Sequence, residues 1–538
     1  MKKIITALLF TIINLSLQAG ELTVSGKNIM KYGNGSEWAG PGKDIEIKKE
    51  FWENQLDLDF AKDEFQFGLR IEATSPSEYG ENIKDITKKY VTYQKDNYTL
   101  TGGDFYTIFG RGLVLDLRES KAEFFDNKIT GGYFNAEKDF GSIKLLGGKS
   151  YYKYYYDKNA LNATVEEMPV NVYGGNAVLN LANIFKNDNF TLETGFSYLK
   201  MRGDSIETND FYQDIFIKES ETGAFSISSA WEGLEFYSEY AVKTVQRDPS
   251  VTGWAGYLSL GYAAKGIGIT LEGKDYYRYS TNPNHLKSGL TPFQNPPEVI
   301  INHRSHLLSA VKHNVNPNDE LGLLLQAQFA PVEGLETAIK AAMSSRRDED
   351  KIMIQQDKRF LPYQDVWAEA SYALNGWKLL GGGGYFLDCP LSKSGNASLY
   401  LNKETENDKT FFDERITGMA EAGYKINEES DAKATFEFQQ VKEGTEILSN
   451  DFNEYYLSAE YNIPAYGYLS VGMTKTTQEV SGDAPDTWLN FEGAYQISAN
   501  HKLEIFYGRE RAGIKCTGGA CRQVPEFEGI RATLVSTF

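Results

Sequence analysis

Two cysteines near the end of the chain are the clearest candidates for chemistry. Cys516 and Cys521 are separated by Thr-Gly-Gly-Ala, and a glycine pair can take the positive φ of a tight turn. The spacing predicts a disulfide that closes a small loop. Half of a metal site or two free thiols are the alternatives. Cys389 is then left over, and we expect it to be a buried, unreactive thiol.

Three of the five histidines are clustered as His303, His306 and His313, a spacing that could serve a metal ion. No cysteine or carboxylate motif accompanies them, so a loop folded into a lumen is the favoured interpretation. The sequence also lacks a Gly-x-Ser-x-Gly elbow and a His-Glu-x-x-His motif, and the glycines at 381–384 do not form a phosphate-binding loop. We therefore expect neither an enzyme nor a bound cofactor.

Charged side chains supply the remaining candidates. Arg111 stands between two glycines and could attract anions at a constriction, or could pair with an inward carboxylate. Asp57 and Asp59 have the spacing of paired catalytic acids, but such pairs recur along this acidic chain and are not specific. The carboxylates that we expect to face a lumen are Asp57, Asp59, Glu72 and Glu193.

The ends of the chain indicate export. Lys2 and Lys3 precede an apolar stretch, and small residues follow near position 19, so residues 1–19 are predicted to be a cleaved signal peptide. Its removal takes two lysines from the formal net charge, which changes from -19 to -21. Without a basic stripe to offset that charge, nucleic acid is excluded as a partner.

Alternating side chains position these candidates on strands. The odd positions of 65–73, and the even positions of 56–60 and 190–198, are mostly apolar, whereas most of the positions between them are polar. This pattern fits a soluble sandwich, and it fits equally a barrel whose apolar face meets lipid. The segments run ten to thirteen residues, close to the ~9–11 of a tilted membrane strand. No later apolar run approaches the ~20 residues of a membrane helix.

Loop lengths favour the barrel, because short and long connections alternate. Tight turns such as Glu232–Gly233 and Asn375–Gly376 alternate with long loops such as Thr107–Asn127 and Ala512–Glu526, which this parity places outside the cell. When Thr281–Asp319 is taken as one loop, about 24 strands result and both termini are periplasmic. Residues 20–538 are therefore predicted to form one large antiparallel transmembrane barrel, with short periplasmic turns and long external or inward-folded loops.

Aromatic and glycine runs fit the same picture. Tyr151, Tyr152 and Tyr154–Tyr156 lie where a strand would leave the bilayer, which indicates an interfacial girdle or, alternatively, a stacking track for sugars. Gly381–Gly384 indicates a strand under close approach or strong curvature. Phe538 ends an alternating apolar strand, so we expect it to act as a signal for the barrel-assembly machinery.

Several short motifs carry a resemblance to a known family. They are the run Gly508–Gly529, the run Gly103–Leu113 with its Gly-Arg-Gly, and Val315–Glu320. These runs resemble an uncharacterised family of Gram-negative outer-membrane proteins catalogued only as a domain of unknown function. The resemblance implies an outer-membrane location and a barrel fold, and it implies no chemistry.

A barrel of about 24 strands has a wide bore, and the stretch before the first predicted hairpin is too short for a plug domain. Long loops, especially Thr281–Asp319 and Thr107–Asn127, must then fold inward, or the barrel must flatten or hold water. We expect a porin-like channel or transporter for small polar solutes, embedded in the lipid bilayer of the outer membrane. A structural or adhesive surface protein without transport is the alternative, and a secreted β-rich enzyme is the third possibility.

Overall fold

The computed structural model describes residues 22–38, 46–78, 82–120, 125–157, 163–186, 190–203, 219–246, 251–279, 293–311, 313, 315–316, 319–347, 353–389, 411–445, 448–479, 486–511, 513–517, 520–524 and 526–538. The predicted signal peptide, residues 1–19, lies outside them. Across these ranges no helix is both long and apolar enough to cross a membrane.

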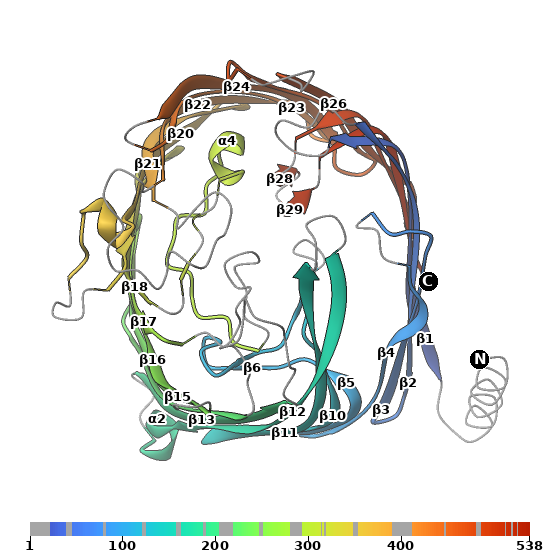
Figure 1. The fold of residues 1–538 in the computed structure, drawn as a ribbon, viewed down its shortest axis with the longest axis vertical. Helices are drawn as coiled ribbons and strands as arrows, with labels where there is room; N and C mark the ends of the chain where they lie inside the picture. Colours follow the sequence, from blue (N-terminus) through green and yellow to red (C-terminus); the bar gives the residue numbers. More distant parts are fainter. Residues whose placement is uncertain are drawn as a thin grey trace.

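Within the described residues, 24 strands form one sheet that closes on itself (Figure 1). Every neighbouring pair is antiparallel, and the last strand, β30, pairs with the first, β1. The wall strands are β1 Thr23–Trp38, β2 Glu46–Lys62, β3 Phe65–Thr74, β4 Lys84–Lys95, β5 Tyr98–Phe105, β10 Ile129–Lys138, β11 Gly141–Asp157, β12 Ala163–Asn180, β13 Thr191–Gly203, β14 Glu219–Trp231, β15 Leu234–Gln246, β16 Val251–Ala264, β17 Ile267–Tyr277, β18 Asp319–Val332, β19 Leu335–Ser345, β20 Tyr363–Leu374, β21 Trp377–Asp388, β22 Phe412–Asn427, β23 Ser430–Gly444, β24 Ser449–Ile463, β25 Gly467–Thr476, β26 Thr487–Ser498, β27 His501–Glu510 and β30 Phe527–Thr537.

The remaining elements are short. They are the strands β6 Ile108–Phe109, β7 Leu115–Asp116, β8 Glu119–Ser120, β9 Phe125–Asp126, β28 Gly513–Thr517 and β29 Ala520–Val524, the helices α2 Leu181–Ile184 and α4 His306–Ser309, and the 3-10 turn η1 Lys358–Phe360. The prediction of one antiparallel barrel of about 24 strands is confirmed.

The alternation of side chains produces an apolar outer face. On β13 and its neighbours Phe196, Phe225 and Tyr240 are exposed in one continuous row, and large apolar side chains are exposed in the same way around the wall. A soluble sandwich buries its apolar faces, so this outer face excludes that alternative. Tight turns follow the sequence signals: Asn375 and Gly376 both take positive φ, 49° and 84°, as a two-residue hairpin turn requires.

The glycine run of β21 marks a close approach, as predicted. A Cβ built at Gly382 or Gly384 would lie 2.9 or 2.8 Å from the indole of Trp367. Trp367 on β20 is buried on the inner face of the wall, and its ring can lie flat there only because two neighbouring positions have no side chain. The glycines therefore make room for a large apolar group inside the barrel.

Long loops fold into the bore rather than away from it. Figure 1 shows β6, α4 and the hairpin β28–β29 inside the ring of wall strands. The sequence predicted inward folding for Thr107–Asn127 and Thr281–Asp319, and the described parts of both loops confirm it. Parity placed Ala512–Glu526 at the external end of the barrel, and its hairpin β28–β29 also lies inside the ring, where β28 contacts α4. Whether an odd or even number of strands precedes a loop determines at which end of the barrel the loop begins. Side-chain packing then determines whether the loop extends into the bore or away from it.

The seam between the first and last strands is reinforced by buried charges. Arg531 of β30 bonds Glu78 at 2.8 Å and Glu510 at 2.5 Å, and Lys31 of β1 also pairs with Glu78. The guanidinium lies 4.7 Å from the ring centre of Phe506. Since Glu78 and Glu510 are almost completely buried, Arg531 is a close charge partner that each carboxylate would lose on its removal. The same strand end is paired through its backbone, since the Phe538 carbonyl accepts from the Gly26 N–H at 2.8 Å.

Replacing Arg531 with methionine should therefore destabilise the closed barrel by about 3–5 kcal/mol, because two buried carboxylates each lose a close charge partner. Folded barrels resist denaturation in detergent, so unboiled protein should migrate differently from boiled protein on a denaturing gel. The temperature at which the folded band disappears measures the change.

Arg509→Met is the matched control for the Arg531 variant. Arg509 bonds Glu528 at 2.9 Å, but that carboxylate is about half exposed, so the pair should contribute at most about 1 kcal/mol. Equal losses in the two variants would show that the seam does not depend on the buried pair.

Candidate functional site in the bore

The first inward loop, residues 106–120, is held by a buried carboxylate of the wall. Glu239 on β15 accepts the backbone N–H of Arg111 at 2.8 Å and the hydroxyl of Tyr237 at 2.7 Å. Gly110 has a φ of 56°, and a Cβ there would lie 2.5 Å from the Glu239 oxygens. Both the positive φ and the close approach require glycine at position 110. The Gly-Arg-Gly motif is therefore the point at which the loop attaches to the wall.

Arg111 itself was predicted to line a constriction or to pair with an inward carboxylate. The structure places its guanidinium 5.0 Å from the ring centre of Tyr237, inside the barrel, and the side chain is exposed. The hydrogen bond to Glu239 is donated by its backbone N–H. The charge therefore stays available to the bore, and its effect on passing ions remains a prediction.

The second inward loop, residues 293–316, is anchored by Glu437 of β23. This carboxylate accepts three donors at the start of α4: the Ser305 hydroxyl at 2.6 Å, the His306 N–H at 2.8 Å and the Leu307 N–H at 3.0 Å. Helix starts leave N–H groups without partners, and a buried start must find them elsewhere. Glu437 supplies them from the wall and so fixes the helix inside the bore.

The three clustered histidines attach the same loop to three separate places. His303 bonds Asp365 at 2.6 Å, His306 stacks on Tyr456 with ring centres 4.0 Å apart, and His313 reaches a third cluster. Among the described residues no group of three or more histidine, cysteine or acidic side chains is arranged to hold a metal ion. The histidines belong to a loop folded into the lumen, which is the interpretation that the sequence favoured.

His313 lies between two buried carboxylates. Its Nδ1 is 2.9 Å from Asp388 and its Nε2 is 3.2 Å from Glu320, which also pairs with Lys274 at 2.5 Å. The ring stacks on Tyr363 with centres 4.2 Å apart. Burial by itself lowers the pKa of His313, but Asp388 and Glu320 outweigh it and raise the pKa from 6.5 to about 9. A charged histidine thus ties the loop to β18 and β21.

The third inward segment begins at Arg511. Its guanidinium bonds the buried Glu454 of β24 at 2.6 Å and lies 5.1 Å from the ring centre of Trp488. Glu454 also lies 3.4 Å from Arg415 of β22. The chain then continues into β28–β29, which contacts α4. The second and third inward segments therefore meet inside the barrel.

The first two loops also bond directly to each other. The Asp116 N–H donates to the Phe293 carbonyl at 2.8 Å, and the Asn295 N–H donates to the Gly112 carbonyl at 3.0 Å. The Tyr279 hydroxyl donates to the Leu113 carbonyl at 2.8 Å. These contacts join two segments that are separated by more than 150 residues of sequence into one body.

That body has an apolar core of its own, which the sequence did not predict. The loop side chains of Phe109, Leu113, Leu115, Ile300 and Leu308 are buried against the wall. The wall contributes inward apolar side chains to this cluster: Val172, Leu199, Tyr257, Tyr276, Leu324, Trp367 and Phe386. The one available signal was the run Leu113-Val114-Leu115, which is unusually apolar for an exposed loop.

The carboxylates predicted to face a lumen lie on the inner side of the wall, but some have partners there. Asp57 bonds Arg70 at 2.5 Å, and Arg70 bonds Glu119 of the first inward loop at 2.5 Å. The Tyr90 hydroxyl donates to Asp59 at 2.7 Å. Glu193 lies 3.4 Å from the amide nitrogen of Asn180, and Glu72 is paired in register with Gln55. Asp57 therefore helps to attach a loop rather than to line free space.

The cysteine predictions are tested only in part. Cys516 and Cys521 lie directly opposite each other in the register of β28 and β29, but their side chains lie outside the described residues. Cys389 is buried, and burial raises the pKa of its thiol to about 12, as expected for an unreactive cysteine. Of the tyrosine run, Tyr151 is exposed, and the side chains of Tyr152 and Tyr154–Tyr156 lie outside the described residues.

The disulfide is testable by mass spectrometry of unreduced peptides. Directly opposed residues of a hairpin are close enough for a bridge, and export supplies an oxidising compartment. Cys516 should be found joined to Cys521, and Cys389 should resist alkylation until the protein is unfolded. Alkylation of all three thiols in the native protein would contradict this assignment.

The His313 cluster predicts a pH-dependent attachment of the second loop. Because its pKa of about 9 in the folded state lies above the ordinary 6.5, the stabilisation is complete below about pH 6.5 and is lost as the pH rises through about 9. Hydrogen exchange of the amides in α4, corrected for the intrinsic rate, should accelerate across it.

The variant His313→Gln carries no titrating ring and serves as the control for this pH step. Its α4 amides should exchange faster than wild type at pH 6 and should show no further step up to pH 9. An unchanged step in the variant would mean that another group is responsible.

A closed barrel with an apolar outer face spans a membrane, because no edge and no unpaired backbone group then meets lipid. This is the architecture of outer-membrane proteins of Gram-negative bacteria, and the chain is a protein of that membrane. No curated protein matches the sequence.

Solved outer-membrane barrels are similar in overall form. The siderophore receptor PirA from Pseudomonas aeruginosa has a TM-score of 0.43 and 9% identity, over 97% of this chain and 80% of that chain. The translocation pore of the P pilus usher PapC has a TM-score of 0.38 and 8% identity, over 96% and 99%. A BenF-like porin from Pseudomonas fluorescens Pf-5 has a TM-score of 0.32 and 11% identity, over 96% and 98%.

The family of the chain is established from its sequence. The model of one protein family, described as a family of unknown function, matches residues 1–538, which is the whole sequence. This agrees with the resemblance carried by the Gly103–Leu113 and Gly508–Gly529 runs. The chain belongs to the DUF6029 family, a family of unknown function.

Proposed function

We propose that the protein is a channel or transporter for small polar solutes whose bore is closed in part by its own loops. The observation that carries the proposal is the way the loops are held. Polar contacts to the wall hold each of them, among them those to Glu239, Glu437 and Glu454, and the first two loops also pack on apolar wall side chains. None of these contacts is strand pairing. Such contacts can break without opening the sheet, because the 24-strand ladder does not include them.

The inner face of the wall near the periplasmic turns is rich in polar side chains, which favours a path for polar solutes there. Acidic side chains of several strands share the inner face there, and none of those named next forms a contact with an inward loop that the structure describes. They are Glu193, Glu235, Glu272, Glu369, Glu421 and Glu460. Inward carboxylates attract cations, so we infer that the path prefers them over anions, with screening over ~8–10 Å at physiological salt.

A second candidate function is supported by the apolar core between the loops and the wall. Burial of Phe109, Leu113 and Leu308 stabilises the filled state, and a permanently filled barrel would serve as an anchor for external loops. Transport and anchoring differ in one measurable respect. A transporter must pass ions or solutes when its loop contacts are loosened, and an anchor must not.

The test of the proposed function is conductance in planar bilayers. The double variant Glu239→Gln, Glu437→Gln keeps the shape of both side chains but removes the charge that strengthens the loop hydrogen bonds, at about 1–2 kcal/mol per site. The fraction of open channels should rise about tenfold or more over wild type. The current should prefer cations and should lose much of that preference at about 1 M salt.

Glu369→Gln is the matched control for conductance. Glu369 lies on the same inner face and accepts from the Trp367 indole at 2.9 Å, but it makes no contact with an inward loop in the described residues. The fraction of open channels should equal that of wild type, because no loop contact is lost. If wild type and the double variant are both electrically silent, the anchoring function replaces the channel.

A further inference from the structure

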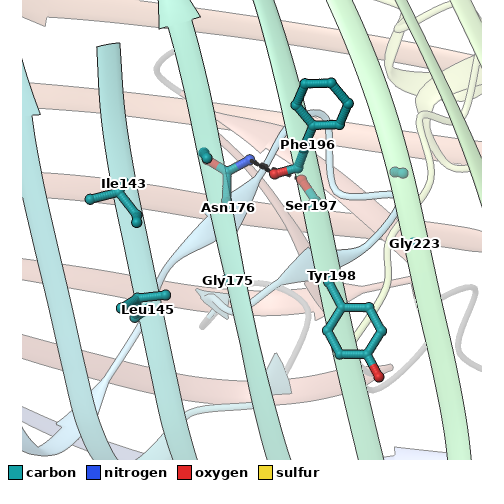
Figure 2. A pocket seen from close by; sticks show the side chains of 10 residues that line it. Ile143, Leu145, Gly175, Asn176, Phe196, Ser197, Tyr198 and Gly223 are labelled. Carbon is teal, nitrogen blue, oxygen red and sulfur yellow. Dashed lines mark hydrogen bonds between the residues drawn. The ribbon is translucent and has the colours of Figure 1, made fainter.

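The outer face of the barrel carries a groove across four strands, β11 to β14. Figure 2 shows its lining: Ile143 and Leu145 form one wall, Phe196 and Tyr198 form the other, and Gly175 lies between them. Gly223 and the small side chains beside it continue the floor. The groove has a volume of about 340 Å³. The four side chains that form its two walls are exposed on the membrane-facing surface.

The groove exists because two of its lining residues, Gly175 and Gly223, are glycines and have no side chain. A Cβ at Gly223 would meet nothing within 4 Å, and a Cβ at Gly175 would first meet a methyl group of Leu145 at 3.0 Å. Neither glycine has the positive φ that would exclude a side chain. The polar residues at the base, Asn176 and Ser197, point to the inside and bond each other at 2.9 Å. The outer surface of the groove is therefore apolar over its length.

The groove lies nearer the periplasmic end of the wall. Gly175 is five residues from Asn180, where β12 ends on the periplasmic side. At ~3.3 Å per residue and a tilt of ~45°, this places Gly175 roughly 12 Å above that end. Ile143, near the start of β11, marks the lower limit of the groove. The neighbouring medium at this depth is the hydrocarbon of the inner leaflet.

A short helical foot lies directly below the groove at the periplasmic rim. α2 connects β12 to β13 and lies outside the ring in Figure 1. The Asn183 amide donates to the Asp139 carbonyl at 2.6 Å, which fixes the foot against the β10–β11 turn. Phe185 is 73% exposed and Ile184 is 45% exposed. Exposed apolar groups at this position fit the boundary between headgroups and acyl chains.

We propose that the groove binds one acyl chain of a phospholipid in the periplasmic leaflet, with the phosphate of that lipid beside the foot. Lys138 and Lys186 are both exposed at this rim: Lys138 precedes Asp139, and Lys186 follows Asn183, whose amide contacts the Asp139 carbonyl. They supply positive charge in a chain of net charge -19. A single acyl chain fits the concave floor.

Native mass spectrometry of the purified full chain can test the site. The probes are phosphatidylglycerol and phosphatidylcholine, both with oleoyl chains, added at equal concentrations in detergent. Wild type should retain one phosphatidylglycerol more firmly than further lipids. Gly223→Leu fills the groove without strain and should weaken retention of that first lipid about tenfold, since packing supplies the attraction between apolar groups in lipid.

Gly418→Leu is the matched control, because Gly418 also faces lipid in ordinary strand backbone with nothing within 4 Å of a Cβ. It should retain the lipid as wild type does, and both variants should keep the folded band on an unboiled gel. The pair Lys138→Gln, Lys186→Gln should remove the preference for phosphatidylglycerol but leave a lipid bound. Equal retention in Gly223→Leu and wild type would overturn the proposal. A dimer that disappears in Gly223→Leu would assign the groove to a second copy of the chain instead.

Discussion

Buried carboxylates of the barrel wall determine how the inside of this protein is organised. An inward loop brings backbone N–H groups away from water, and each such group costs free energy unless it finds an acceptor. Glu239 and Glu437 provide these acceptors, one for each of the first two loops. Glu454 does the same for the guanidinium of Arg511. Without them the N–H groups at Arg111 and at the start of α4, and the Arg511 guanidinium, would lose these acceptors inside the barrel.

Part of the acidic composition therefore serves to hold the structure together. A net charge of -19 suggests a negatively charged channel, but many inward carboxylates are bound to loop donors, to Arg70 or to Arg531. The charges that remain on the inner wall are concentrated towards the periplasmic turns.

The apolar core inside the barrel adds a second constraint. Wall positions such as Val172 and Trp367 face inward, although an inner face of a wide barrel is expected to be polar. They are apolar because loop residues such as Leu113 and Leu308 cover them. Part of the interior is therefore an apolar core like that of a soluble domain, while the outer surface is that of a membrane protein. Glycines such as Gly382 and Gly110 provide the space for the internal packing.

The sequence by itself determined the wall. Apolar and polar side chains alternate along 65–73 and 190–198. Only a strand places such a pattern with its apolar side chains towards lipid and its polar side chains towards the bore, because successive side chains of a strand point to opposite faces. Turn residues such as Asn375-Gly376 and the alternation of short and long loops then gave the antiparallel order and the strand number. These signals are local, so they can be read without any knowledge of what each strand contacts.

Only the tertiary structure decided what the loops do. Asp57 and Glu72 are both inward carboxylates by the alternation of the sequence. Asp57 bonds Arg70, thirteen residues away, and Arg70 in turn bonds Glu119 of the first inward loop. Glu437 accepts from His306 across a separation of 131 residues. Contacts of that kind depend on the path of each loop through the bore. That path is set by the packing of the whole interior, for which no local pattern of residues exists.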